Sequence, residues 1–411
     1  MHFLKIDEVA AKWGISPRAV QILCKEGKID GAQRFGHAWM IPESAARPID
    51  RRTREGRLIN GENPSFPRQT PFLYMTDLYT TPGTADEASI KFADNYEARV
   101  LFEAEIAYAR GEIDKVYTRA SYLLGKHSGF YAVLSAGILL AQCAIWRGDL
   151  ELWRAAKMHI SEAPAQNDVD RDIMLLAICM VDIMLYNVTD FPDWFRVGCF
   201  EPLHKDSFPA AKVFYAKYLY TIGYGVATGE FLLEGVDGLS LMRLLPNMFE
   251  PMISQASADR SLVSEICLRM SCAAAYHNSG DDAQAIRHID RAIALALPDK
   301  LYGLLSEYCR VMDSLLEQRL LAIDPDSYRE VKALHRVYNE GWSHLSGTAR
   351  GRTLATTLSV KEREVAKLAA FGMSNAQIAE KLHMSVSVVK QSIRVVSEKT
   401  GMSRREIAKV L

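Results

Sequence analysis

The sequence predicts a mainly α-helical protein in three parts, with a small domain at each end of a long helical body. Apolar residues keep helical spacing almost throughout from Glu87 to His344, as packed amphipathic helices do. Helix start and stop signals follow one another closely near the C-terminal end. Residues 1–58 carry a net formal charge of +4 and residues 354–411 carry +5 within a total of −1, so the middle carries −10. Basic ends on an acidic body indicate that nucleic acid meets the ends.

The C-terminal domain, residues 348–411, divides into four short helices. A serine precedes each helix as its cap, and a glycine ends two of them. The serines are Ser359, Ser374, Ser385 and Ser403, and the glycines are Gly372 and Gly401. Ser359 and Glu362 together form a capping box, so the first helix is expected to start near Val360. Four short helices with a sharp turn before the longest are a helix-turn-helix layout.

The third of these helices, expected to run to Thr400, has two distinct faces. One arc is apolar and is expected to face the core; it holds Val386, Val389, Ile393 and Val396. Another arc holds Ser387, Lys390, Gln391 and Arg394, and none of these four residues is acidic. This second face is suited to base edges and phosphates in a major groove of double-stranded DNA.

The C-terminal stretch resembles the DNA-binding domain of LuxR-type (GerE-type) regulators. The matching positions are Ser359, Glu362, Glu364, Val365, Gly372, Ser374, Asn375, Ile378, Ala379, Leu382, Ser385, Val389, Lys390, Lys399 and Gly401. The chain departs from the pattern at Val388 and Ser392, where the family usually has Thr and His. The resemblance implies base reading by Lys390, Gln391 and Arg394, further DNA contacts from Ser374, Asn375, Ser385 and Ser387, and a homodimer paired through residues 403–411. The alternative is a helix-turn-helix that serves only in dimerisation.

Residues 1–59 predict a second small domain of the same general kind. Ile6, Val9, Ala10 and Trp13 give one helix its buried side, and Ser16 with Pro17 starts another. Residues 33–35 and 38–41 are strand candidates that form a hairpin through Gly36 and His37. The arrangement resembles the winged helix-turn-helix of the MerR and excisionase families, which implies DNA contacts from Arg18, Gln21, Lys25, Arg34 and His37. The alternative is a module of this fold that contacts proteins.

Between the two ends, the sequence predicts a linker at residues 60–86 and a helical-repeat body at 87–347. Gly-acid turns recur between amphipathic helices, at Gly111-Glu112, Gly148-Asp149 and Gly280-Asp281. Residues 273–298 resemble a tetratricopeptide repeat, so the body is expected to stack helix pairs and to bind a small molecule, a peptide or a protein. The aromatic residues of 214–224 either line a ligand groove or pack in the core, and the core is favoured. The Gly/Ser/Thr-rich stretch 341–353 predicts a hinge.

The sequence gives no sign of catalysis, a cofactor or a metal site. It contains no GxxxxGK[ST], GxSxG, HExxH or CxxC motif, and His159, His204, His277 and His288 have no metal-ligand spacing. Seven cysteines without such pairing indicate reduced core residues. The absence of an apolar signal core predicts a cytoplasmic protein, and residues 131–146 predict a buried helix and no membrane contact.

The combined interpretation is a sequence-specific DNA-binding transcription regulator whose helical body senses an effector or partner. The alternative is a helical-repeat adaptor whose terminal helix-turn-helix domains contact proteins. A regulator should bind DNA with a steep salt dependence and a large preference for its own site, whereas an adaptor should show neither.

Overall fold

The computed structural model describes two compact units, residues 1–65 and 66–411, and each is considered by itself. The described residues are 3–13, 16–25, 29, 31–36, 38–43, 45, 66–92, 94–125, 128–188, 190–228, 237–312, 314–350, 360–370 and 372–400. Predictions for His37, Ser359 and residues 401–411 lie outside them.

The N-terminal unit consists of two helices and a three-stranded antiparallel sheet. Its elements are β1 (Phe3–Lys5), α1 (Ile6–Trp13), α2 (Pro17–Lys25), β2 (Gln33–Phe35) and β3 (Ala38–Pro42). The strand order is β1-β3-β2, so the predicted hairpin forms, and the unpredicted β1 adds to its other edge. The Ser16 hydroxyl accepts a hydrogen bond from the Ala19 N–H at 3.2 Å, as expected of a helix cap. Buried Val9, Val20 and Ile41 belong to one small core.

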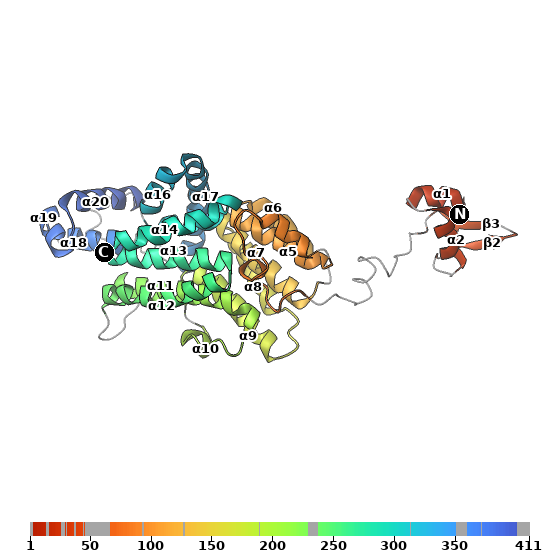
Figure 1. Ribbon diagram of the computed structural model, residues 1–411, viewed down its shortest axis with the longest axis horizontal. Helices are drawn as coiled ribbons and strands as arrows, with labels where there is room; N and C mark the ends of the chain where they lie inside the picture. Colours follow the sequence, from red (N-terminus) through yellow and green to blue (C-terminus); the bar gives the residue numbers. More distant parts are fainter. Residues whose placement is uncertain are drawn as a thin grey trace. The chain divides into compact units, whose positions relative to one another are not determined.

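The body of the larger unit is a stack of antiparallel helices (Figure 1). Its α-helices are α4 (Ala85–Ala88), α5 (Tyr96–Arg110), α6 (Ile113–Leu124), α7 (Phe130–Arg147), α8 (Leu150–Ser161), α9 (Asp168–Met184), α10 (Asp193–Arg196), α11 (Phe208–Thr228), α12 (Gly238–Ala258), α13 (Leu262–Ser279), α14 (Asp282–Ala296), α15 (Tyr302–Tyr308), α16 (Leu315–Ile323) and α17 (Pro325–Arg350). Short 3₁₀ helices are η1 (Leu73–Met75), η2 (Ser89–Phe92), η3 (Lys205–Ser207), η4 (Leu297–Asp299) and η5 (Cys309–Val311).

The predicted Gly-acid turns connect helix hairpins. Gly111, Gly148 and Gly280 end α5, α7 and α13 with φ angles of 86°, 65° and 93°, which an L side chain rarely adopts. Asp149 and Asp281 then accept hydrogen bonds from the N–H groups of the first turns of α8 and α14. These turns place α5 against α6, α7 against α8 and α13 against α14.

The predicted linker at residues 60–86 is wrong for residues 66–86, because the body already begins there. Leu73 and Tyr74 are buried, and the Glu105 carboxylate accepts hydrogen bonds from their N–H groups at 3.1 and 3.0 Å. The Asp299 carboxylate binds the N–H of Ala85 at 3.0 Å. The Pro- and Gly-rich composition that indicated a linker ends near residue 71, and the apolar run after it supplies core residues.

The predicted hinge at residues 341–353 is also wrong as far as residue 350. Helix α17 continues through this stretch to Arg350, and Trp342 and Leu345 are buried. A Cβ on Gly341 would lie 2.3 Å from the carbonyl oxygen of Trp146 on α7. The small residues therefore allow close helix packing here and do not mark a flexible break.

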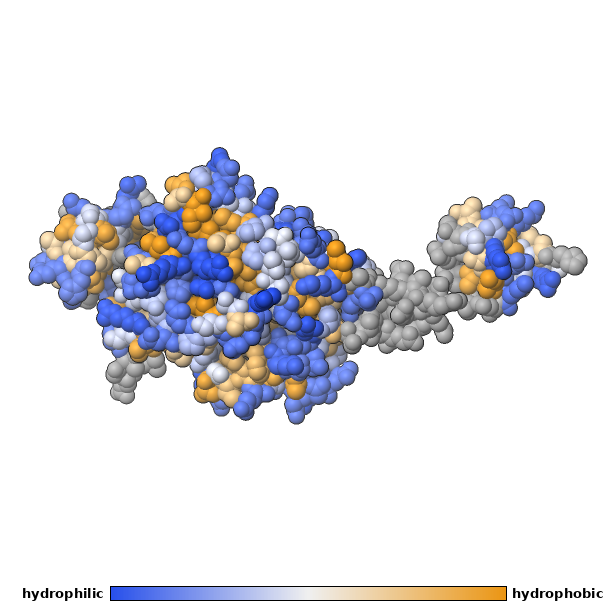
Figure 2. Space-filling model, in the orientation of Figure 1, coloured by the Kyte–Doolittle hydropathy of each residue, from blue (hydrophilic) through white to orange (hydrophobic). Residues whose placement is uncertain are grey.

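Helix α7, which covers the apolar run 131–146, lies inside the body. Among the described residues it is the helix long and apolar enough to cross a membrane, yet 78% of it is buried within the protein. All seven cysteines are free, and Cys199 alone of them is exposed. Figure 2 shows hydrophilic residues over most of the visible face, with hydrophobic ones scattered between them.

The C-terminal domain contains α18 (Val360–Ala370), α19 (Asn375–Lys381) and α20 (Val386–Thr400). Helix α18 starts at Val360 as predicted, and Gly372 follows it with a φ of 82°. Ser374 caps α19 in a capping box completed by Gln377. The core of the domain is made of Val365, Leu368, Ala369, Ile378, Ala379 and Val389.

Candidate nucleic-acid interface

Helix α20 has the two faces that its sequence predicts, except in its first turn. Val389 and Val396 are buried, and Ile393 packs against the domain core. Val386 was expected in the core but is 41% exposed, because the buried stripe begins one turn later, at Val389. The core therefore fixes the rotation of α20 through its later turns.

The polar face of α20 is open to solvent. Ser387, Lys390, Gln391 and Arg394 are all exposed, and they lie on the side opposite Val389 and Val396. Two long cations on one exposed helix face can reach phosphates, and the amide of Gln391 can read an adenine edge. None of these four side chains is a carboxylate.

The serines that were predicted to contact DNA lie at the starts of helices, and two of them, Ser374 and Ser385, cap those helices. The Ser385 hydroxyl accepts a hydrogen bond from the Val388 N–H at 3.3 Å and lies 2.8 Å from the Ser387 hydroxyl. The Ser374 hydroxyl accepts a hydrogen bond from the Gln377 N–H at 3.3 Å. Asn375, the first residue of α19, is half-buried. These side chains position the starts of α19 and α20, where N–H groups also attract phosphate.

One side of α20 faces the helical body. Val388, Gln391 and Ser392 line a cavity together with body residues that include Glu317 and His335. This edge of the polar face therefore borders the body.

The N-terminal unit presents a second polar face on α2. Arg18, Gln21 and Lys25 are exposed there, whereas Val20 and Cys24 on the other side are buried. Arg34 is exposed on β2, in the hairpin. The described residues thus place the predicted contacts on one helix face and one strand.

The structure brings together three side chains of kinds that can bind a metal ion, and the sequence did not predict this cluster. Glu250, Cys272 and His288 come from α12, α13 and α14, and their ligand atoms lie within 4.8 Å of one another. The ring of His288 contacts the Glu250 carboxylate at 3.0 Å and stacks on Tyr276, and burial raises the pKa of the Cys272 thiol. These contacts account for the cluster as side chains packed in or beside the core. Its three residues are too far apart in the sequence to form a metal-binding spacing motif.

Comparison with known families identifies the C-terminal domain. Residues 356–411 match the model of bacterial regulatory proteins, luxR family. The match covers α18, α19 and α20 but under a sixth of the chain, and it supports a DNA-binding transcription regulator. Searches of curated proteins and of solved structures found no match to the chain.

Proposed function

We propose that this protein is a sequence-specific transcription regulator of the cytoplasm, in which the helical body senses an effector or a partner. The observation that carries the proposal is the luxR-family match over residues 356–411 together with the exposed cationic face of α20. The proposed DNA complex is a homodimer, as the LuxR resemblance implies.

The body and the C-terminal domain are coupled along the chain by α17. This helix packs against α7 and α15 in the body, and residues 351–359 then join it to α18. A ligand that moves α17 would change how readily the C-terminal domain leaves the body. Because the cavity beside Gln391 lies between domain and body, such a change would alter the access of DNA to α20.

Replacing Lys390 or Arg394 with alanine is expected to weaken specific DNA binding by about 1–3 kcal/mol each. Both side chains are exposed, so neither change should unfold the domain. The measurement is a mobility-shift titration of the full chain on a duplex enriched by selection from random sequence. Arg154→Ala is the matched control, since Arg154 is an exposed cation of the body that pairs with Glu151. Operator affinity equal to that of the unchanged protein in both variants would reject α20 as the reader.

We further propose that the N-terminal unit is a winged helix-turn-helix that reads DNA independently. Its support is the exposed face of Arg18, Gln21 and Lys25 on α2 beside the hairpin that carries Arg34. In a full chain already carrying Lys390→Ala and Arg394→Ala, selection against random duplexes should still enrich a motif.

Adding Arg18→Ala and Gln21→Ala to that chain should abolish the motif. Lys12→Ala is the control, because Lys12 lies on α1 and donates a hydrogen bond to the Glu43 carbonyl at 2.6 Å. Failure to enrich any motif, with the unit still folded by NMR, would instead make it a protein-contact module.

A further inference from the structure

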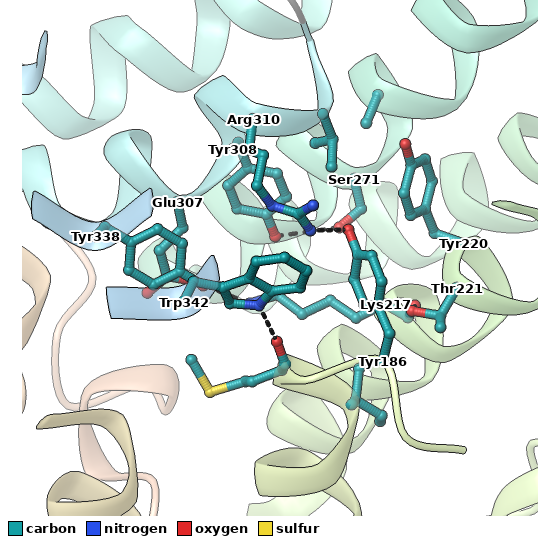
Figure 3. A pocket seen from close by; sticks show the side chains of 14 residues that line it. Tyr186, Lys217, Tyr220, Thr221, Ser271, Glu307, Tyr308, Arg310, Tyr338 and Trp342 are labelled. Atoms are coloured by element: carbon teal, nitrogen blue, oxygen red, sulfur yellow. Dashed lines mark hydrogen bonds and ion pairs between the residues drawn. The ribbon is translucent and has the colours of Figure 1, made fainter. Parts of the chain in front are cut away.

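A polar and aromatic pocket lies inside the helical body, where α9, α11, α13, α15 and α17 converge (Figure 3). Its cavity volume is about 70 Å³, which suits a small molecule of one ring and not a peptide. Five aromatic side chains form much of the wall: Tyr186, Tyr220, Tyr308, Tyr338 and Trp342. The sequence indicated only Tyr220 of this set, because the others come from segments far apart in the chain.

Two cations and one carboxylate line this pocket. The Lys217 ammonium lies 3.4 Å from the Glu307 carboxylate, and the third charged residue is Arg310. The formal charges of the lining therefore sum to +1. Burial lowers the pKa of Lys217, but the negative charge of the Glu307 carboxylate raises it, and the net shift is upward. Both cations thus stay charged at neutral pH.

Arg310 is held in place by aromatic neighbours. Its guanidinium carbon lies 3.7 Å from the centre of the Trp342 ring and 4.8 Å from that of Tyr186. One of its N–H groups donates to the Tyr186 hydroxyl (Figure 3). The Trp342 ring is itself fixed, because its N–H donates to the Met184 carbonyl at 2.7 Å. A guanidinium fixed in this way is preorganised to receive an oxyanion in its plane.

We propose that this pocket binds the effector, and that the effector is a small monoanion consisting of a flat aromatic ring with one carboxylate. One negative charge balances the +1 lining, and the carboxylate accepts hydrogen bonds from Arg310. The ring of the ligand packs against the tyrosine and tryptophan side chains. This assignment rests on the proposed regulatory function, since it names the ligand class that the body senses.

Ligand binding in this pocket affects structural elements that border the C-terminal domain. Tyr338 and Trp342 belong to α17, the helix that leads to α18. Arg310 lines both this pocket and the cavity beside Gln391 of α20. A ligand that engages Arg310 and Trp342 therefore acts on two elements that border the C-terminal domain.

The test uses the full chain and three probes, benzoate, 1-naphthoate and indole-3-acetate, each beside its primary amide. Thermal shift and tryptophan fluorescence should show saturable binding of at least one acid at pH 7. Its amide should bind at least about tenfold more weakly, because a hydrogen bond to a charged group is lost. Arg310→Met should remove this preference for the acid, whereas Arg319→Met should not, since Arg319 pairs with Asp290 outside the pocket.

If Arg310→Met fails to fold, Lys217→Gln is tested in its place. Lys217→Gln lowers the formal charge of the pocket lining to zero, so it should also reduce the preference for the acid over the amide. Equal binding of acids and amides, or no binding by any probe, would overturn the proposal. DNA mobility shifts on the same samples separate the two claims: intact DNA binding without ligand binding rejects only the ligand class. Ligand binding without specific DNA binding would reject the proposed function as a transcription regulator but would leave the proposed ligand site standing.

Discussion

Val389→Asp is expected to unfold the C-terminal domain while the helical body stays folded. Val389 is fully buried and packs in one cluster with Val365, Leu368 and Ile378. Burying an unpaired carboxylate costs several kcal/mol, which is a large share of the stability of a domain this small. Hydrogen exchange of the full chain should show loss of protection over residues 360–397, and specific DNA binding should disappear.

Val388→Asp is the matched control for this change. Val388 is the neighbouring residue of α20 but is 39% exposed, so a carboxylate there stays hydrated. Protection of α18–α20 should remain in this control. If Val389→Asp kept the same protection as the control, the assignment of the buried face of α20 would be wrong.

Gly341→Ala is expected to destabilise the body by about 3 kcal/mol, a large effect for the addition of one methyl group. The added Cβ would lie 2.3 Å from the Trp146 carbonyl oxygen and 2.4 Å from that of Ile145. Both are backbone atoms of α7, so no side-chain rotation relieves the overlap and α17 must move. Urea unfolding followed by circular dichroism should show a lower midpoint.

Gly125→Ala tests whether the effect comes from crowding rather than from the loss of a glycine. Gly125 has a φ of −75°, and its nearest new contact would be 3.6 Å away. This change should leave stability unchanged or raise it by about 0.5 kcal/mol, since it restricts the unfolded chain. A body equally stable in both variants would contradict the close packing of α17 on α7.

Local signals predicted the helix boundaries well. A capping serine or aspartate and a closing glycine act within one turn of the chain, and they gave the starts of α19 and α20 and the ends of α5, α7 and α13. The exposed face of α20 followed from helical periodicity alone. Val386 was misplaced because periodicity gives a direction around the helix and not how far the core extends along it.

Features that depend on distant segments could not be predicted. Gly341 lies in a stretch whose composition is typical of a hinge. Its structural role, however, is to let α17 approach the carbonyl groups of α7, which lie nearly two hundred residues earlier in the chain. Strand β1 is too short for a periodic signal, and it is defined by pairing with β3. The pocket around Arg310 likewise combines side chains from several helices, so no single motif marked it.

To show whether α20 reads a specific DNA sequence, the full chain is titrated with selected and with random duplexes at a series of salt concentrations. We expect binding to the selected duplex to be at least about 10³-fold tighter than binding to random duplex at physiological salt. We also expect a steep fall in both affinities between about 50 and 200 mM salt. Equal affinity for the two duplexes at every salt concentration would contradict it.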